Sequence, residues 1–127
     1  MRTLPPSVAV VDDDLSIRKS IERLLNAHGF TTEVFASAEA FLSRGYLNQI
    51  TCLVLDIHLG GMSGIELQRQ LVAAGTKLPV IFITAIDEED LELAALEAGC
   101  VAYLHKPFPA ASLIGAIRKA LPDLPPE

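Results

Sequence analysis

The sequence has few cysteines, few basic residues and no long apolar run, and each shortage argues against a class of protein. Two cysteines, Cys52 and Cys100, are too few for a disulfide framework; both adjoin apolar stretches, which favours small core residues in a reducing cytoplasm. Ten basic residues against 16 acidic ones give a net charge of −6, which argues against nucleic-acid binding by this segment. No apolar run approaches the length of a membrane span, and residues 1–6 lack the apolar core of a signal peptide.

The length and composition are typical of one globular domain. The chain has 127 residues, of which 50% are hydrophobic and 20% are charged. We expect an N-terminal tail at residues 1–6, where two prolines discourage regular structure, and a single domain over residues 7–121. Residues 122–127 are expected to be a proline-rich tail or the start of a linker.

Short apolar runs alternate with amphipathic stretches along the whole chain. The runs predict five strands, at residues 7–11, 31–35, 52–56, 79–84 and 100–104. Capping and stop residues predict five helices: from Asp14 to Gly29, from Ser37 to Gly45, over 65–74, from Asp87 or Glu88 to Gly99, and from Pro109 to Leu121. The helix over 65–74 is expected to bury Leu67, Leu71 and Val72. This alternation predicts an α/β fold with a doubly wound, five-stranded parallel sheet of order 2-1-3-4-5, a flavodoxin-like (βα)5 three-layer sandwich.

Polar residues follow four of the five predicted strands. The first strand runs into Asp12 and Asp13, the third ends at Asp56, the fourth ends at Thr84, and the fifth is followed by Lys106. In open parallel sheets the ligand site lies beyond the carboxyl ends of the strands, where the strand order reverses. We therefore expect three carboxylates, one hydroxyl and one ammonium to meet at one edge of the sheet.

This set of side chains predicts a magnesium-dependent phosphoryl acceptor. Three neighbouring carboxylates repel one another unless a cation binds them, and an all-oxygen site suits Mg²⁺. No spacing of cysteine and histidine indicates a zinc site. A carboxylate left ionised beside the metal can act as a nucleophile, while Lys106 and Thr84 meet the oxygens of an incoming phosphoryl group.

Five short motifs carry a resemblance to a known family. They are Val-Asp-Asp at 11–13, Leu-Val-Leu-Asp at 53–56, Gly-Met-Ser-Gly at 61–64, Ile-Thr-Ala at 83–85 and Lys-Pro-Phe at 106–108. In this order and spacing the chain resembles the receiver domain of bacterial two-component response regulators, from about Ser7 to Leu121. The run Val-Phe-Ala-Ser-Ala-Glu at 34–39, followed by Ala-Phe-Leu at 40–42, is most similar to FixJ-type receivers.

The resemblance implies a role for each residue of the metal site. Asp56 accepts a phosphoryl group from a phosphohistidine of a sensor histidine kinase or a phosphotransfer protein. Asp13 and Asp56 bind Mg²⁺, or Mn²⁺, directly, and Asp12 does so largely through water. The backbone carbonyl of His58 completes the protein ligands.

The same resemblance implies how phosphorylation of the site changes the rest of the domain. Thr84 and Lys106 contact the phosphoryl group, and Tyr103 turns inward when Thr84 is drawn to it. Ala85 is small and leaves the site accessible, and the bond before Pro107 is expected to be cis. Phosphorylation then changes the surface of the fourth helix, fifth strand and fifth helix, a possible homodimer interface, to control a transcriptional output. The domain is not an enzyme, although it assists its own phosphorylation and dephosphorylation.

One departure and two alternatives remain open at this point. Relatives usually have proline at the position of Gly60, so the loop containing Gly60 and Gly61 is expected to be loose and to weaken metal binding. A haloacid-dehalogenase-type phosphatase also ends its first strand with Asp-x-Asp, which would make Asp12 the nucleophile. It needs a late acidic pair, whereas Asp123 stands alone in the tail. The other alternative is a stand-alone receiver that acts as a phosphorelay or binding module.

Overall fold

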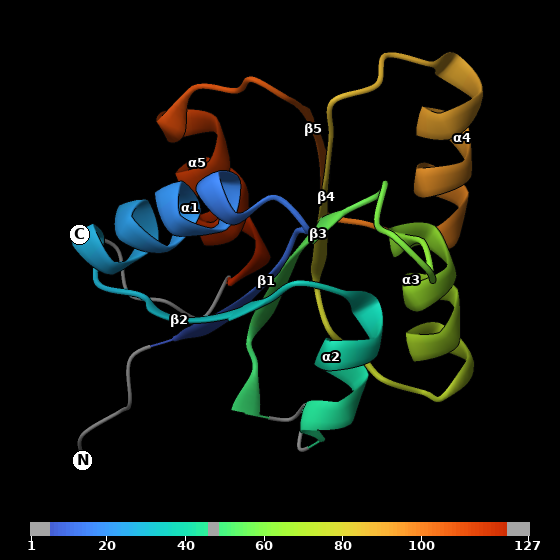
Figure 1. Cartoon of the computed structure of the whole chain (residues 1–127), viewed down its shortest axis with the longest axis horizontal. Helices are drawn as coiled ribbons and strands as arrows, with labels where there is room; N and C mark the ends of the chain where they lie inside the picture. Colours follow the sequence, from blue (N-terminus) through green and yellow to red (C-terminus); the bar gives the residue numbers. More distant parts are fainter. Residues whose placement is uncertain (1–5, 46–48, 122–127) are drawn as a thin grey trace.

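The computed structural model describes residues 6–45 and 49–121 (Figure 1). The tails expected at 1–6 and 122–127 therefore lie outside the described residues, apart from Pro6. Its carbonyl accepts a hydrogen bond from the Thr31 amide at 2.9 Å. The elements in chain order are β1 (Ser7–Val11), α1 (Leu15–Ala27), β2 (Thr31–Phe35), α2 (Ala38–Arg44), β3 (Cys52–Asp56), α3 (Gly64–Ala73), β4 (Val80–Thr84), α4 (Glu89–Ala98), β5 (Ala102–His105) and α5 (Ala110–Ala120).

The five strands form one parallel sheet of order β2-β1-β3-β4-β5, which confirms the predicted topology. Helices α1 and α5 cover one face of the sheet, and α2, α3 and α4 cover the other, so the fold has three layers (Figure 1). In the described part of the chain, no helix is both long enough and apolar enough to cross a membrane.

The central strand β3 supplies side chains to both halves of the core. Leu53 and Leu55 pack on the side of α2, α3 and α4, whereas Cys52 and Val54 pack on the side of α1 and α5. All four are fully buried. Each fully buried aliphatic side chain stabilises a fold by about 1.5–3 kcal/mol, so this strand holds its last residue, Asp56, in a rigid position.

Side-chain caps begin the two helices, α1 and α3, that follow the strands ending at the carboxylates. The Asp14 carboxylate accepts the Ile17 amide at 3.1 Å and starts α1, as predicted. Ser63 and Glu66 form a reciprocal capping box at the start of α3. These caps fix where the chain leaves the strands that end at the carboxylates.

Two local predictions were wrong. Strand β5 begins at Ala102, opposite Ile81, rather than at residue 100, because the chain first turns at Gly99, whose φ is 97°. Val72 was expected in the core but is 56% exposed. Leu67 and Leu71, four residues apart, already form the buried stripe of α3, and the next position points away from the sheet.

Candidate metal centre

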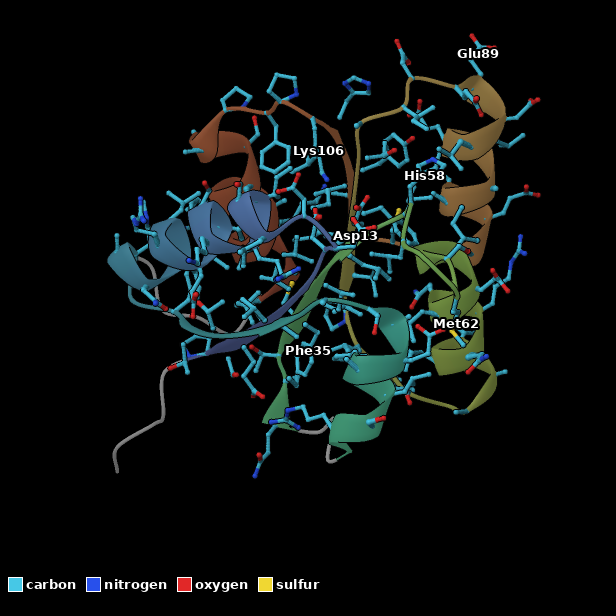
Figure 2. All side chains as sticks on the ribbon, in the orientation of Figure 1. Asp13, Phe35, His58, Met62, Glu89 and Lys106 are labelled. Carbon is cyan, nitrogen blue, oxygen red and sulfur yellow. The ribbon has the colours of Figure 1, made fainter. Side chains whose placement is uncertain are left out.

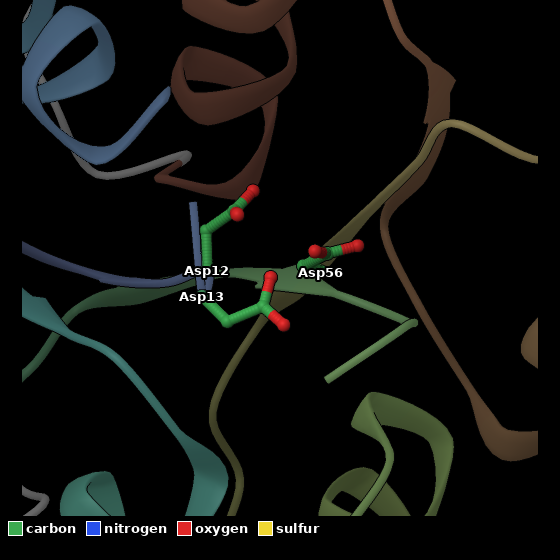
Figure 3. A group of neighbouring side chains, drawn as sticks. All are labelled: Asp12, Asp13 and Asp56. Atoms are coloured by element: carbon green, nitrogen blue, oxygen red, sulfur yellow. The ribbon is translucent and has the colours of Figure 1, made fainter. Parts of the chain in front are cut away.

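Three carboxylates meet at the carboxyl edge of the sheet (Figure 3). Asp12 and Asp13 directly follow β1, and Asp56 is the last residue of its neighbour β3. One oxygen from each carboxylate lies within 4.8 Å of the other two. Because hard divalent cations prefer carboxylate oxygens, this donor set fits Mg²⁺.

The three carboxylates differ in what they contact. Asp12 is fully buried, and its Oδ1 accepts the Asp14 amide at 2.9 Å while its Oδ2 lies 2.7 Å from Lys106 Nζ. Asp13 is exposed, and its carboxylate accepts no hydrogen bond from any residue that the structure describes. Both oxygens of Asp12 are thus engaged by the protein, whereas Asp13 presents its carboxylate to whatever approaches the edge.

Asp56 is a carboxylate with little access to solvent. The residue is 4% exposed; its Oδ1 accepts the His58 amide at 3.3 Å, and Lys106 Nζ lies 3.5 Å from its Oδ2. Burial, and then the negative charge of Asp12, raise the pKa of Asp56 to about 6, against the opposing effects of Lys106 and the His58 amide. The folded chain therefore disfavours the ionised form of Asp56, which takes up a proton at a higher pH than an ordinary aspartate does.

Lys106 connects the carboxyl ends of β1 and β3. Its ammonium contacts both Asp12 and Asp56, and its amide donates to the Thr84 carbonyl at 2.7 Å. Burial disfavours the charge of Lys106, but the hydrogen bond to Asp12 and the charges of Asp56 and Asp12 outweigh it, so the pKa of Lys106 is raised. The Lys106–Pro107 peptide bond is cis.

Thr84 and Tyr103 lie on β4 and β5, beside this centre. Thr84 is fully buried, and its Oγ1 accepts the Ile86 amide at 3.1 Å, which leaves the hydroxyl hydrogen available to a further acceptor. Ala85, which directly follows Thr84 in the sequence, is exposed. Tyr103 is half-buried against the core on the side of α4. Burial, followed by the charges of acidic residues at the start of α4, raises the pKa of Tyr103.

Two structural features shape the segment that follows Asp56, and the sequence indicated only one of them, a glycine at the start of α3. A Cβ on Gly64 would lie 2.3 Å from the Asp56 carbonyl oxygen, so only glycine allows α3 to start this close to β3. Glu39, from α2, accepts the Met62 amide at 3.0 Å. The Gly-Met-Ser-Gly motif pointed to the glycine, but nothing near Glu39 in the sequence indicated its partner.

A further contact holds the backbone directly after β1. Arg18, on α1, donates from a guanidinium nitrogen to the Asp12 carbonyl oxygen at 2.7 Å. His58 is exposed, on the loop that leaves β3, and Figure 2 shows it to the right of Asp13 and Lys106. The five polar residues expected at the sheet edge come from four strand ends, and Arg18 holds the backbone of one of them, Asp12.

The family described as the response regulator receiver domain matches residues 8–118 of the chain. The chain belongs to that family. The receiver is similar to the response regulator protein TodT of Pseudomonas putida, with 36% identity over 114 residues that cover 90% of this chain and 50% of TodT. It spans about half the length of the curated relatives it matches.

Solved structures agree with this assignment. The response regulator StyR has 43% identity and a TM-score of 0.87, over 94% of this chain and 60% of the StyR chain. The structure titled FixJ-N has 33% identity and a TM-score of 0.85, over 98% of this chain and all of that one. The resemblance to FixJ-type receivers is therefore confirmed, and the phosphatase alternative is not favoured. Receiver domains generally bind Mg²⁺ at an acidic aspartate cluster, and here that cluster is Asp12, Asp13 and Asp56.

Proposed function

We propose that the receiver is a phosphorylation-controlled switch in which Asp56 accepts a phosphoryl group from a phosphohistidine of a sensor kinase or phosphotransfer protein. The observation that carries the proposal is the position of Asp56. It is a buried carboxylate at the centre of the sheet edge, 3.5 Å from the Lys106 ammonium and beside the exposed carboxylate of Asp13. A carboxylate oxygen of Asp56 attacks phosphorus, the phosphorus–nitrogen bond of the donor breaks, and an aspartyl phosphate forms.

The exposure of the carboxylates supports a division of labour among them. Asp13 and Asp56 hold Mg²⁺ or Mn²⁺ directly with the His58 carbonyl, and Asp12 acts through water because the Asp14 amide and Lys106 already engage its two oxygens. When bound, the cation supplies positive charge to the carboxylates and to the oxygens of the phosphoryl group.

Lys106 and Thr84 are the protein groups placed to recognise the modified aspartate. The Lys106 ammonium is close enough to Asp56 to exchange its carboxylate contact for a phosphoryl oxygen. The Thr84 hydroxyl hydrogen is available to a second phosphoryl oxygen. A shift of Thr84 toward the site opens space beside it, which Tyr103, on the adjacent strand, can enter. Ala85 leaves the approach to the aspartate unobstructed.

The position of Tyr103 indicates which surface of the domain responds to phosphorylation. It lies on β5, between the helices α4 and α5 at that edge of the sheet (Figure 1). A change in its orientation alters the α4-β5-α5 surface, through which the phosphorylated domain forms a homodimer and controls transcription. Relatives that carry the name of transcriptional regulators, among them FixJ, support this output. The receiver itself makes no contact with nucleic acid and acts in the cytoplasm.

Intact-mass measurement after incubation with acetyl phosphate and Mg²⁺ tests the acceptor. The wild-type chain should gain the mass of one phosphoryl group, and the nearly isosteric variant Asp56→Asn should gain none. An adduct that persists in Asp56→Asn but disappears in Asp12→Asn would instead identify Asp12 as the nucleophile. No adduct on the wild-type chain with either acetyl phosphate or a phosphorylated kinase would contradict the proposal.

A further inference from the structure

Glu39 links helix α2 to the loop that follows the proposed phosphoacceptor. It lies in the first turn of α2, and its Oε2 accepts the backbone amide of Met62 at 3.0 Å, 23 residues further along the chain. Met62 belongs to the segment between β3 and α3, which starts directly after Asp56. A side chain from one helix therefore holds the backbone of a loop that also carries His58.

Gly61 makes this contact possible. Its φ is 82°, in the left-handed region, and a Cβ at this position would lie 2.8 Å from Glu39 Oε2. Any larger residue would occupy the space through which the carboxylate reaches the Met62 amide. The absence of a side chain at Gly61 thus serves the contact with Glu39.

The ends of the loop are anchored independently of Glu39. The His58 amide donates to Asp56 at 3.3 Å, the Gly64 amide donates to the Ile57 carbonyl at 2.9 Å, and Ser63 caps α3. Across residues 59–62, by contrast, the Glu39–Met62 bond is the one hydrogen bond to another residue found in the described ranges 6–45 and 49–121. Gly60 adds no restraint, since nothing lies within 4 Å of where its Cβ would be.

We propose that Glu39 is a positioning residue of the metal centre, which holds the loop at Met62 and so keeps the His58 carbonyl in place beside Asp56. This inference rests on the proposed function, because it assigns the His58 carbonyl to the metal. The hydrogen bond is charge-assisted, and the Met62 amide lowers the pKa of Glu39, which agrees with an ionised carboxylate as the acceptor. A loop expected to be loose because of Gly60 and Gly61 is restrained from α2 instead.

Four variants test the role of Glu39. Glu39→Ala removes the acceptor, Glu39→Gln keeps a neutral acceptor of the same length, and Glu97→Ala removes an exposed glutamate of α4 as the matched control. The double variant Glu39→Ala/Gly60→Ala stiffens the loop by another route, because alanine has fewer backbone conformations than glycine and its Cβ at position 60 meets open space in the fold.

Hydrogen exchange of the Met62 amide and calorimetric Mg²⁺ titration are measured on the whole chain. For Glu39→Ala we expect exchange at Met62 to become about tenfold faster, the His58 amide resonance to shift, and the Mg²⁺ dissociation constant to rise about three- to tenfold. Glu39→Gln should retain most of the affinity, the double variant should recover part of it, and Glu97→Ala should match the wild type. The thermal unfolding midpoint in the absence of metal should change little in every variant.

The outcomes separate this inference from the function on which it rests. A wild-type chain that binds no Mg²⁺ would overturn the proposed metal centre and the role of Glu39 together. A wild-type chain that binds Mg²⁺ with the same affinity as Glu39→Ala would overturn the role of Glu39 alone, whether or not exchange at Met62 changes. Unchanged protection of the Met62 amide in Glu39→Ala would show that the bond does not hold the loop.

Discussion

The ammonium of Lys106 lies 2.7 Å from a carboxylate oxygen of Asp12, a residue 94 positions earlier in the chain. Its distance to Asp56, the proposed phosphoacceptor, is longer, at 3.5 Å. The lysine is therefore held mainly by the fully buried carboxylate of Asp12. The ion pair between Lys106 and Asp12 connects the chain after β5 with the end of β1. It leaves Oδ2 of Asp56 in only a long contact with the same ammonium.

Replacing Lys106 should destabilise the metal-free fold more than an ordinary surface change does. Lys106→Met leaves Asp12 and Asp56 without their cation, and we expect a loss of about 2–4 kcal/mol in the free energy of unfolding at pH 7. Urea denaturation measures the free energy of unfolding. The control is Lys77→Met, which replaces an exposed lysine. The loss should shrink when Mg²⁺ is added. Equal effects of the two substitutions would show that the buried pair contributes nothing.

Replacing Asp56 should have the opposite effect. Burial raises the pKa of Asp56 from 3.8 to about 6, so the folded chain disfavours the ionised carboxylate. A carboxyl whose pKa is raised by folding costs stability above that pKa, and the cost disappears as the pH falls toward the unfolded value. Asp56→Asn should therefore stabilise the metal-free fold by about 1–3 kcal/mol at pH 7.5.

The pH dependence checks this interpretation. The difference in unfolding free energy between Asp56→Asn and wild type should narrow between pH 7.5 and pH 5, as Asp56 takes up a proton in the folded chain. Asp87→Asn, at an exposed position, should show no such trend. A difference that stays constant over this range would mean that Asp56 does not titrate there.

Gly64 should tolerate no side chain. Gly64→Ala places a Cβ 2.3 Å from the Asp56 carbonyl oxygen, which requires α3 or the end of β3 to move. We expect a loss of about 2–4 kcal/mol in unfolding free energy, together with weaker Mg²⁺ binding. Gly60→Ala, four residues earlier and in open space, should change stability by no more than about 0.5 kcal/mol. Similar chemical denaturation curves for both variants would contradict the close approach.

The two neighbouring acids Asp13 and Asp14 should separate metal binding from helix capping. Mg²⁺ at 100 times its dissociation constant should stabilise the wild type by about 2.7 kcal/mol, and Asp13→Asn should lose most of this gain. Asp14→Asn should keep it, because asparagine can still cap α1 through the Ile17 amide. Thermal unfolding with Mg²⁺ and with a chelator measures both. A full metal effect in Asp13→Asn would exclude Asp13 as a ligand.

Much of this protein can be predicted from local sequence because the signals act over a few residues. Apolar runs and caps such as Asp14 and Ser37 mark the strands and helices, and their alternation leads to a parallel sheet with the observed strand order. The carboxyl ends of parallel strands share one edge, so the meeting of Asp12, Asp13 and Asp56 also follows from the order of elements.

The sequence by itself thus determined the fold, the family and the composition of the carboxylate cluster. Only the tertiary structure decided which partners those residues take. Lys106 contacts both Asp12 and Asp56, and only the packed structure places its ammonium closer to Asp12, at 2.7 Å, than to Asp56, at 3.5 Å. The contact between Glu39 and Met62 depends equally on how close α2 comes to a loop that follows another strand. Such contacts join residues far apart in the chain, and no local pattern encodes them, because packing of the whole sandwich sets the distances.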